Sequence, residues 1–321
     1  MKILAILPAS IGGRLTMQSI FDGFAQNGFD VFLFDKLKDD EKKLRQLCKE
    51  QEFDFLVGYD FAGLKIKVDN ELQIKTINYF SDVIEDNHSG NYWQEYYKYL
   101  KEDDNYTFYW DKELYLEKKD EILNLFYQPH FVNTEVYKNF NSCPQYDIMF
   151  AGRIDTDFRL RSLLELMAHF EDKKFAWYAI EKHFEDAKSR VNNSAEIALL
   201  EKNYCGFIST EEQMAKAINN AKIFFNFNAQ GISSLNYRTF QVMSCERVMF
   251  SDDRLEAHTL FSPDKDIVIY NNLDDLKSKI EIYLNNKDLY FETAKAARKS
   301  ILKNHSSLKS VKNMLDLISF N

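Results

Sequence analysis

The stretch "IFFNFNAQGISSLNYRTFQVMSCERVMFS", residues 223–251, contains a complete strand–loop–helix–strand pattern. The β-type run Ile223–Phe227 is followed by a polar loop, and a segment with core-like residues begins near Leu235. A second β-type run, Val248–Ser251, comes directly after that segment. Because alternating strands and helices form parallel α/β units, this stretch predicts one such unit.

Apolar runs typical of strands recur along the whole chain. In the first half they are Ile3–Leu7, Val31–Phe34, Phe55–Val57, Lys75–Tyr79, a weaker Tyr106–Trp110, and Leu123–Tyr127. In the second half they are Asp147–Phe150, Phe175–Ile180, Tyr204–Ile208, Ile223–Phe227, Val248–Ser251 and Asp266–Tyr270. Amphipathic stretches separate them, among them Leu15–Gln26, Arg161–Phe170 and Glu211–Asn219. Each half holds about six units, the complement of one doubly wound sheet, so we predict an α/β fold with two tandem Rossmann-like domains.

Proline marks the expected boundary between these domains. Two of the four prolines, Pro129 and Pro144, bracket the stretch "HFVNTEVYKNFNSC", and a new β-type run begins directly afterwards. We therefore expect an N-terminal domain over 1–143 and a C-terminal domain over 144–305. The amphipathic helix expected over 306–321 could lie on either, including back on the first domain.

Composition narrows the possible functions. The 321 residues are 45% hydrophobic and 15% aromatic, which excludes a disordered chain. The net charge of −9 argues against broad binding to nucleic acid, although local donors can still hold an anionic small ligand. The four cysteines lack metal-ligand spacing, which fits a reducing compartment. No apolar run approaches the ~20 residues that span a bilayer, so we expect a cytoplasmic protein.

The second half contains three glycines, Gly152, Gly206 and Gly231, each in or after a predicted strand. Ligands of open α/β sheets bind at the carboxyl ends of the strands, where glycine lets backbone N–H groups approach phosphate. Any one of these glycines could simply form a turn. Three at one sheet edge favour a phosphate-binding site.

Arginines follow Gly152 in the stretch "GRIDTDFRLRSLLELM". A helix N-terminus attracts anions, and arginine adds bidentate donors suited to a diphosphate. The alternative is that these arginines pair with the neighbouring Asp155 and Asp157. We expect Arg153 and Arg159 to face the ligand.

The densest candidate site is the stretch "FFNFNAQGISSLNYRTFQVMSC", residues 224–245. Backbone donors at the helix start, together with Ser233, Ser234 and Asn236, would form an anion cradle. Arg238 and Gln241 then project from one face of the first turns. The alternative is a solvated surface turn.

The first half offers two weaker candidates. Gly12, Gly13 and Arg14 lie between the first strand and the first helix, without the third glycine of a dinucleotide fingerprint. The loop "SDVIEDNHSG" contains Asp82, Glu85, Asp86 and His88, which could be metal ligands, acid/base groups or a solvated loop. His130, after Pro129, is equally compatible with a structural role. No GxSxG, HExxH or Walker motif occurs, which weakens hydrolase and nucleotide-hydrolase hypotheses.

The C-terminal half resembles a known family. The stretch "NYRTFQVMSCERVMFSDD" is similar to the pattern R-x-F-E-x-M-x-C-G, followed by a strand ending in Asp, of GT-B glycosyltransferases. The closest fit is the CgeB-like branch of the group 1 transferases. "YDIMFAGRIDTDFRLRSLL" and "YQPHFVNTEVYKNF" resemble the start of the same domain and the passage leading to it. The resemblance covers about residues 125–305.

The resemblance implies an active site in an interdomain cleft, with a nucleotide-sugar donor on the second domain and an acceptor facing the first. Gly152, Arg153 and Arg159 would approach the diphosphate, and the backbone of Gly206, Phe207 and Ile208 would receive the nucleobase. Phosphate, sugar and ribose would be held by Asn228, Ser233, Asn236, Tyr237, Arg238 and Gln241. Gly12, Gly13, Arg14, Asp82 and His88 would border the acceptor. Arg238, Gln241, Asp82 and His88 are the expected catalytic residues.

The chain departs from the family pattern at two positions. Gln241 stands where the family usually has glutamate, and Glu246 where it has glycine. Of the paired glutamates seen in many relatives, the counterparts would be Ser233 and Gln241. A glutamine can bond a ribose hydroxyl but cannot stabilise positive charge as a carboxylate does.

The resulting hypothesis is a bacterial glycosyltransferase that works with retention and without a metal or other cofactor. Its partners would be a nucleotide-sugar donor and a glycan, lipid-linked or protein acceptor of the cell surface, with no nucleic acid. Association with the inner face of the membrane is left open. The alternatives are a GT-B-shaped sugar-nucleotide epimerase and a non-catalytic module that binds a sugar nucleotide or a partner.

Overall fold

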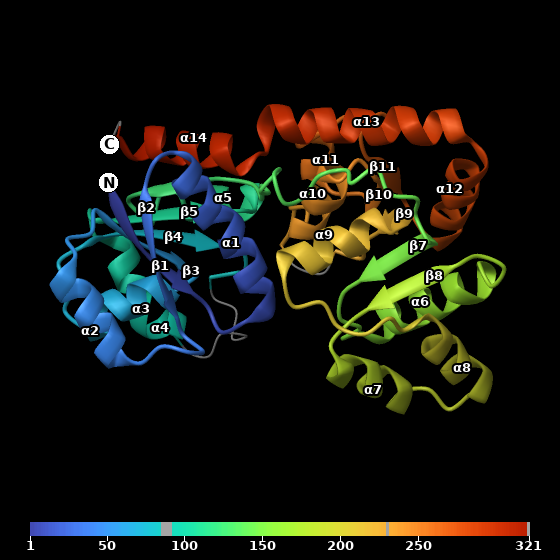
Figure 1. Ribbon diagram of the computed structural model, residues 1–321, viewed down its shortest axis with the longest axis horizontal. Coiled ribbons are helices and arrows are strands. Elements are labelled where there is room, and N and C mark those ends of the chain that lie inside the picture. Colours follow the sequence, from blue (N-terminus) through green and yellow to red (C-terminus); the bar gives the residue numbers. More distant parts are fainter. Residues whose placement is uncertain (85–91, 229–230, 320–321) are drawn as a thin grey trace. The chain divides into compact units, whose positions relative to one another are not determined.

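The computed structural model describes residues 1–84, 92–228 and 231–319, and the chain divides into two compact units (Figure 1). The N-terminal unit comprises Met1–Asn133, Ala229–Tyr237 and Asn304–Asn321, and the C-terminal unit comprises Thr134–Asn228 and Arg238–Lys303. Each unit is built on its own parallel sheet with helices around it. The predicted fold of two Rossmann-like sheets is confirmed.

The N-terminal unit has a sheet with the strand order β2-β1-β3-β4-β5-β6, in which every pairing is parallel. The order reverses between β1 and β3, which creates a crevice at the carboxyl ends of those two strands. The elements are β1 (Lys2–Leu7), α1 (Ile11–Gln26), β2 (Asp30–Asp35), α2 (Glu41–Glu50), β3 (Phe55–Tyr59), α3 (Ala62–Asp69), β4 (Lys75–Phe80), α4 (Tyr92–Tyr96), the 3-10 helix η2 (Tyr97–Lys101), β5 (Asn105–Tyr109), α5 (Lys112–Lys118), β6 (Leu125–Tyr127) and α14 (Ser307–Ser319).

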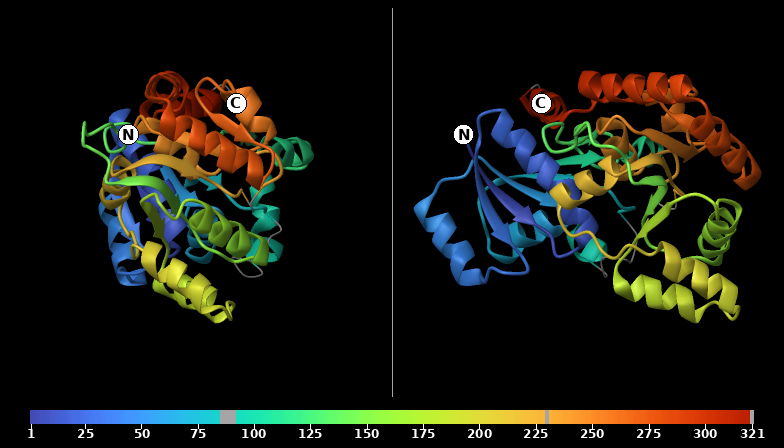
Figure 2. Two further views of the ribbon diagram at one scale, coloured as in Figure 1. Left: turned by 90° about the vertical axis from the view of Figure 1, so that its right-hand side faces the viewer. Right: turned by 45° about the vertical axis from the view of Figure 1, so that its right-hand side comes forward.

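The C-terminal unit has the strand order β11-β10-β9-β7-β8, again all parallel. Here the order reverses between β7 and β9. The elements are β7 (Tyr146–Ala151), α6 (Asp157–His169), β8 (Phe175–Tyr178), α7 (Glu181–Ser189), α8 (Ser194–Asn203), α9 (Glu211–Asn219), β9 (Ala221–Phe225), α10 (Tyr237–Ser244), β10 (Val248–Asp252), α11 (Leu255–Leu260), β11 (Val268–Tyr270), α12 (Leu273–Asn285) and α13 (Lys287–Asn304). β8 is an edge strand of this sheet, and Figure 2 shows α7 and α8 at that edge.

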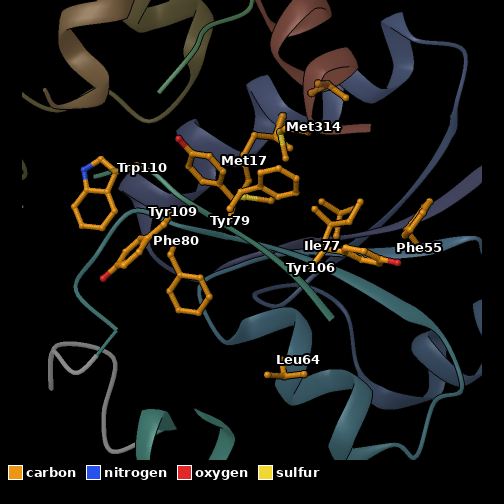
Figure 3. Packing of buried hydrophobic residues seen from close by; sticks show 14 of the residues in the cluster. Met17, Phe55, Leu64, Ile77, Tyr79, Phe80, Tyr106, Tyr109, Trp110 and Met314 are labelled. Atoms are coloured by element: carbon orange, nitrogen blue, oxygen red, sulfur yellow. The ribbon is translucent and has the colours of Figure 1, made fainter. Parts of the chain in front are cut away.

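Both faces of the N-terminal sheet are covered, which explains its near-continuous apolar strands. Ile3 and Ala5 of β1 belong to the core on the side of α1 and α14, whereas Leu4 and Ile6 belong to a second cluster with α2 and α3. Side chains of a strand alternate between faces, so one strand supplies both cores. Figure 3 shows Met17 of α1 and Met314 of α14 beside Tyr79 of β4.

One predicted strand is wrong. In the described chain, residues 204–208 form a single bridge, Trp177 to Tyr204, instead of a sixth strand in the C-terminal sheet. Gly206 has φ +89°, outside the range of extended backbone, so the ladder cannot continue. Tyr204 suggested a strand because it is aromatic. In the structure its ring instead stacks on Phe184, with ring centroids 4.0 Å apart.

The division into units falls after Asn133, whereas the sequence placed it near residue 143. Backbone N–H groups of Val132 and Asn133 donate to His305 O and Ser19 Oγ, at 3.0 and 3.1 Å, which keeps this stretch in the N-terminal unit. The C-terminal helix α14 packs on α1 of the same unit. Among the described residues, no helix combines the length and apolarity that crossing a membrane requires.

The close approach of α14 to α1 depends on Gly23. A Cβ at this position would lie 2.5 Å from Val311 Cγ2 and 2.8 Å from the carbonyl oxygen of Ser307. We expect Gly23→Ala to lower the free energy of unfolding by about 1–3 kcal/mol, since the two helices must separate. Gly12→Ala in the same helix is the matched control, because a Cβ there meets nothing within 4 Å. Thermal unfolding of both variants measures this, and equal melting temperatures would contradict it.

Candidate active site

Three loops of the C-terminal unit meet at the carboxyl edge of its sheet, beside the point where the strand order reverses. They follow β7, β9 and β10 and contain Gly152, Asn228 and Arg254. The loop after β7 leads into α6, whose first turn is capped by Thr156, where Oγ1 accepts the Arg159 N–H at 3.2 Å. This is the edge at which doubly wound sheets bind ligands.

Two predicted arginines lie together at this edge. Arg153 Nε and Arg159 Nη1 bond the two oxygens of Asp155, at 2.8 and 2.9 Å. Arg159 also donates to Phe227 O, at 2.5 Å, which links the loops after β7 and β9. Asp157 is instead bonded by Arg190 at 2.6 Å. The two arginines share one carboxylate, so the group carries a net positive charge.

Arg254 and Asp252 complete this edge, and the sequence analysis missed both as site residues. Arg254 donates to Asp252 Oδ2 at 2.9 Å and to Asn228 O at 2.8 Å. Asn228 donates its amide to Asp252 Oδ1 at 2.6 Å, while its own buried Oδ1 accepts no hydrogen bond in the described chain. The signal that could have revealed them was the polar run "SDDR" that follows the last apolar residue of β10.

Arg238 and Gln241 bond each other on α10. Arg238 Nη1 donates to Gln241 Oε1 at 2.5 Å, and Gln241 Nε2 donates to the Tyr137 hydroxyl, also at 2.5 Å. Gln241 is 0% exposed. Burial raises the pKa of the Tyr137 hydroxyl well above its usual value, so it stays protonated. The buried amide of Gln241 therefore has a partner at each end.

The loop before α10 has the cradle geometry that the sequence predicted, and a carboxylate of the same unit occupies it. Asp111 Oδ2 accepts the N–H groups of Ile232, Ser233 and Ser234, at 2.8, 2.9 and 3.0 Å. Its Oδ1 accepts the Ser233 hydroxyl at 3.0 Å and two N–H groups at the start of α5. Asp111 was not a sequence candidate, because nothing local distinguishes it from an ordinary helix cap.

The environment of Asp111 keeps this carboxylate charged. Burial alone would raise its pKa, but hydrogen bonds from the N–H groups of Leu114, Ser233 and Ile232 outweigh that effect, and the pKa lies below its ordinary value. Gly231 makes the close approach possible, because it has φ +73° and a Cβ there would lie 2.5 Å from Asp111 Oδ2. The backbone donors predicted for a phosphate are thus bonded to a protein carboxylate.

The other predicted donor-side residues lie in two places. Tyr237 bonds Ser19 Oγ at 2.6 Å, and its ring lies 5.7 Å from that of His130, all within the N-terminal unit, which also contains Asn236. In the C-terminal unit, Gly206 accepts the Ala179 N–H through its carbonyl. Phe207 is exposed, and Ile208 is buried.

On the N-terminal unit, Gly12, Gly13 and Arg14 begin α1 at the reversal point of the sheet. Arg14 makes a bidentate bond to Asp35, at 2.8 and 2.7 Å. Hydrogen bonding to Arg14 lowers the pKa of Asp35 to about 2, so this pair is ionised at neutral pH. A Cβ on Gly13 would lie 3.0 Å from the Tyr59 ring, which packs against this turn.

The same edge carries a buried acid that the sequence analysis did not single out. Asp60 follows β3 with a left-handed φ of +47°, and its Oδ1 accepts the Ser81 N–H at 3.1 Å. Burial, with the charge of Asp82 as a further cause, raises its pKa well above the usual value. Tyr59 and Ser81 share a hydrogen bond next to it. Asp82 therefore belongs to this cluster, whereas Glu85, Asp86 and His88 lie outside the described residues.

Comparisons with known proteins agree with this architecture. Residues 166–316 match a family model described as glycosyl transferase-like. Sucrose-phosphate synthase from Thermosynechococcus elongatus superimposes with a TM-score of 0.74 at 10% identity, over 100% of this chain and 98% of that one. A glycosyltransferase from Rickettsia africae gives 0.69 at 13% identity, over 99% and 98%.

A third solved structure is HepE from Anabaena in complex with UDP-glucose, with a TM-score of 0.72 at 8% identity over 100% of both chains. At such identities the likeness shows the fold. No curated protein matches the sequence. The resemblance to GT-B glycosyltransferases is confirmed, and placement in the CgeB-like branch stays a prediction.

Asp111 provides a direct test of the loop geometry. Asp111→Asn replaces one acceptor oxygen by an NH₂ group, which would face at least two backbone N–H donors. We expect the free energy of unfolding to fall by about 2–6 kcal/mol, because each buried donor left without an acceptor costs about 1–3 kcal/mol. Ser233→Ala removes a single bond to the same carboxylate and should cost about 1 kcal/mol. Urea unfolding compares the two variants, and similar losses would contradict the role of Asp111.

Proposed function

We propose that this nucleotide-sugar glycosyltransferase takes its sugar from a uridine diphosphate donor and passes it to a hydroxyl of a surface glycan, a lipid-linked sugar or a protein. The observation that carries the proposal is the set of arginines at the carboxyl edge of the C-terminal sheet, Arg153, Arg159 and Arg254. Uridine diphosphate is the nucleotide in the HepE complexes that share this fold.

The chemistry requires positive charge where the leaving group forms. When the bond from the anomeric carbon to the phosphate oxygen breaks, the nucleoside diphosphate gains negative charge. Arg153 and Arg159 supply fixed guanidinium donors for this charge, and the N-terminus of α6 adds its dipole. Donors held in place before the reaction stabilise the transition state more than the ground state. This supports transfer in which arginine rather than a metal compensates the diphosphate.

The acceptor side is assigned to the carboxyl edge of the N-terminal sheet. Gly13, Tyr59 and Asp60 lie there beside the point where the strand order reverses. Burial raises the pKa of the Asp60 carboxyl and keeps it protonated to a higher pH than usual, so it can donate a hydrogen bond to an acceptor hydroxyl. We propose retention of the anomeric configuration, on the resemblance to the group 1 transferases.

Donor binding can be tested without knowing the acceptor. UDP should raise the melting temperature of the protein, since a ligand that binds only the folded state stabilises it. Arg153→Ala should weaken UDP binding about tenfold, because one charge-assisted contact contributes about 1.5–3 kcal/mol. Arg153 is 43% exposed and pairs only with Asp155 in the described chain, so its removal should leave the fold intact.

Arg161→Ala is the matched control, because Arg161 is 58% exposed and pairs with Glu196, away from the edge. UDP affinity should be unchanged in that variant. Release of UDP from a UDP-sugar panel, with and without sugar acceptors, then separates the enzyme classes. Release that depends on an acceptor supports transfer, whereas epimerised donor without release supports an epimerase. Absence of any UDP-induced shift would refute the donor assignment.

A further inference from the structure

A pocket of about 440 Å³ opens on the C-terminal unit at the amino-terminal edge of its sheet. Lys222 is the second residue of β9, and Arg247 directly precedes β10. The arginine edge follows the carboxyl ends of the same strands, so strands rising roughly 3.3 Å per residue separate the two places. The pocket is lined by Asn139, Asn141, Ser142, Pro144, Lys222, Arg247, Tyr283, Leu284, Lys287, Tyr290 and Phe291.

The charged residues of the lining are all cationic. It contains three cationic side chains and no carboxylate, although the chain as a whole has 50 acidic against 41 basic residues. Lys222 bonds Asp147 at 2.7 Å, whereas Lys287 has no ion pair in the described part of the chain. A local excess of positive charge in an acidic protein favours an anionic ligand.

Arg247 is the buried cation of this pocket. It is 5% exposed, and among the described residues its Nη groups donate only to backbone carbonyls, those of Cys245, Glu246 and Asn219, at 3.0–3.4 Å. Its buried Nε–H has no acceptor within the described residues. A buried charge without a counter-ion is costly, and an anion in the pocket would offset that cost.

The lining also contains aromatic side chains. The rings of Tyr290 and Phe291 lie edge to face, with centroids 5.3 Å apart. Tyr290 donates its hydroxyl to Lys222 O at 3.2 Å, which fixes this ring against the start of β9. Phe291 remains 54% exposed, so an apolar ring is presented to whatever enters. Asn139 and Ser142 add neutral polar groups to the lining.

We propose that this pocket is a second ligand site, specific for a small anion with an aromatic or otherwise apolar body. Three cations would hold the anionic group, and Tyr283, Tyr290 and Phe291 would contact the body. The volume lies within the range of about 300–1,000 Å³ typical of small-molecule sites. Because it lies at the other edge of the sheet, its ligand would occupy a different site from the sugar donor.

The probe 1-anilinonaphthalene-8-sulfonate tests both features, because it joins an aromatic body to one negative charge. N-phenyl-1-naphthylamine is the same body without the sulfonate. In fluorescence titrations, Lys287→Glu should raise the Kd of the sulfonate probe about tenfold and change that of the neutral probe less than twofold. Phe291→Ala should weaken both probes by a similar factor. UDP at saturation should displace neither.

The control variants lie on α13, the helix that contains Lys287 and Phe291. Lys295 and Leu302 are exposed on α13 outside the pocket lining, so Lys295→Glu and Leu302→Ala should leave both affinities unchanged. Equal loss in Lys287→Glu and Lys295→Glu would mean that only overall charge matters, and would overturn the proposal. Displacement by UDP, or failure of the sulfonate probe to bind the native protein, would overturn it as well. If the protein failed to bind UDP, the probe titrations would still test this pocket. The two proposals can therefore fail separately.

Discussion

The hydrogen bonds to the Asp111 carboxylate hold the loop before α10 in the N-terminal unit. Asp111 is 0% exposed and accepts from N–H groups on two separate stretches, the start of α5 and residues 232–234. Buried backbone donors must find acceptors, and a turn of successive N–H groups cannot bond to itself. One ionised oxygen pair meets that requirement for both stretches. Gly231 is needed because any side chain there would meet the carboxylate.

This arrangement changes where a phosphate could be held. The loop has the concave set of N–H groups that binds anions in many proteins, but its donors already bond an anion of the chain itself. The donors proposed for a diphosphate are side chains at the carboxyl edge of the C-terminal sheet, where Arg153 and Arg159 share one aspartate. Two guanidinium groups on one carboxylate leave a net positive charge. In the loop at 232–234, by contrast, the three N–H groups are already bonded to the charged carboxylate of Asp111.

Local sequence pattern was sufficient for the strands, and it failed where the deciding contact is distant. The nearly continuous buried runs of β1 and β9 are visible in any short window, since a strand covered on both faces is apolar along almost its whole length. Tyr204 looked like part of a strand because stacking on Phe184 also selects an aromatic residue. Asp111 could not be recognised, because its partners at 232–234 are more than a hundred positions away. The position of Arg153 and Arg159 at the carboxyl edge of the sheet was predictable because the strand, the glycine and the helix start are adjacent in the chain.

The hydrogen bonds of Gln241 explain why an amide suits this position. A glutamate here would put a full negative charge against Arg238 and would need the Tyr137 hydroxyl to donate to it. The amide accepts from Arg238 and donates to Tyr137, so it satisfies both without neutralising the guanidinium. The glutamine therefore preserves the geometry of α10 while leaving the positive charge of Arg238 uncompensated by residue 241. In the proposed transfer, that difference would act on the electrostatics at the start of α10 rather than on the fold.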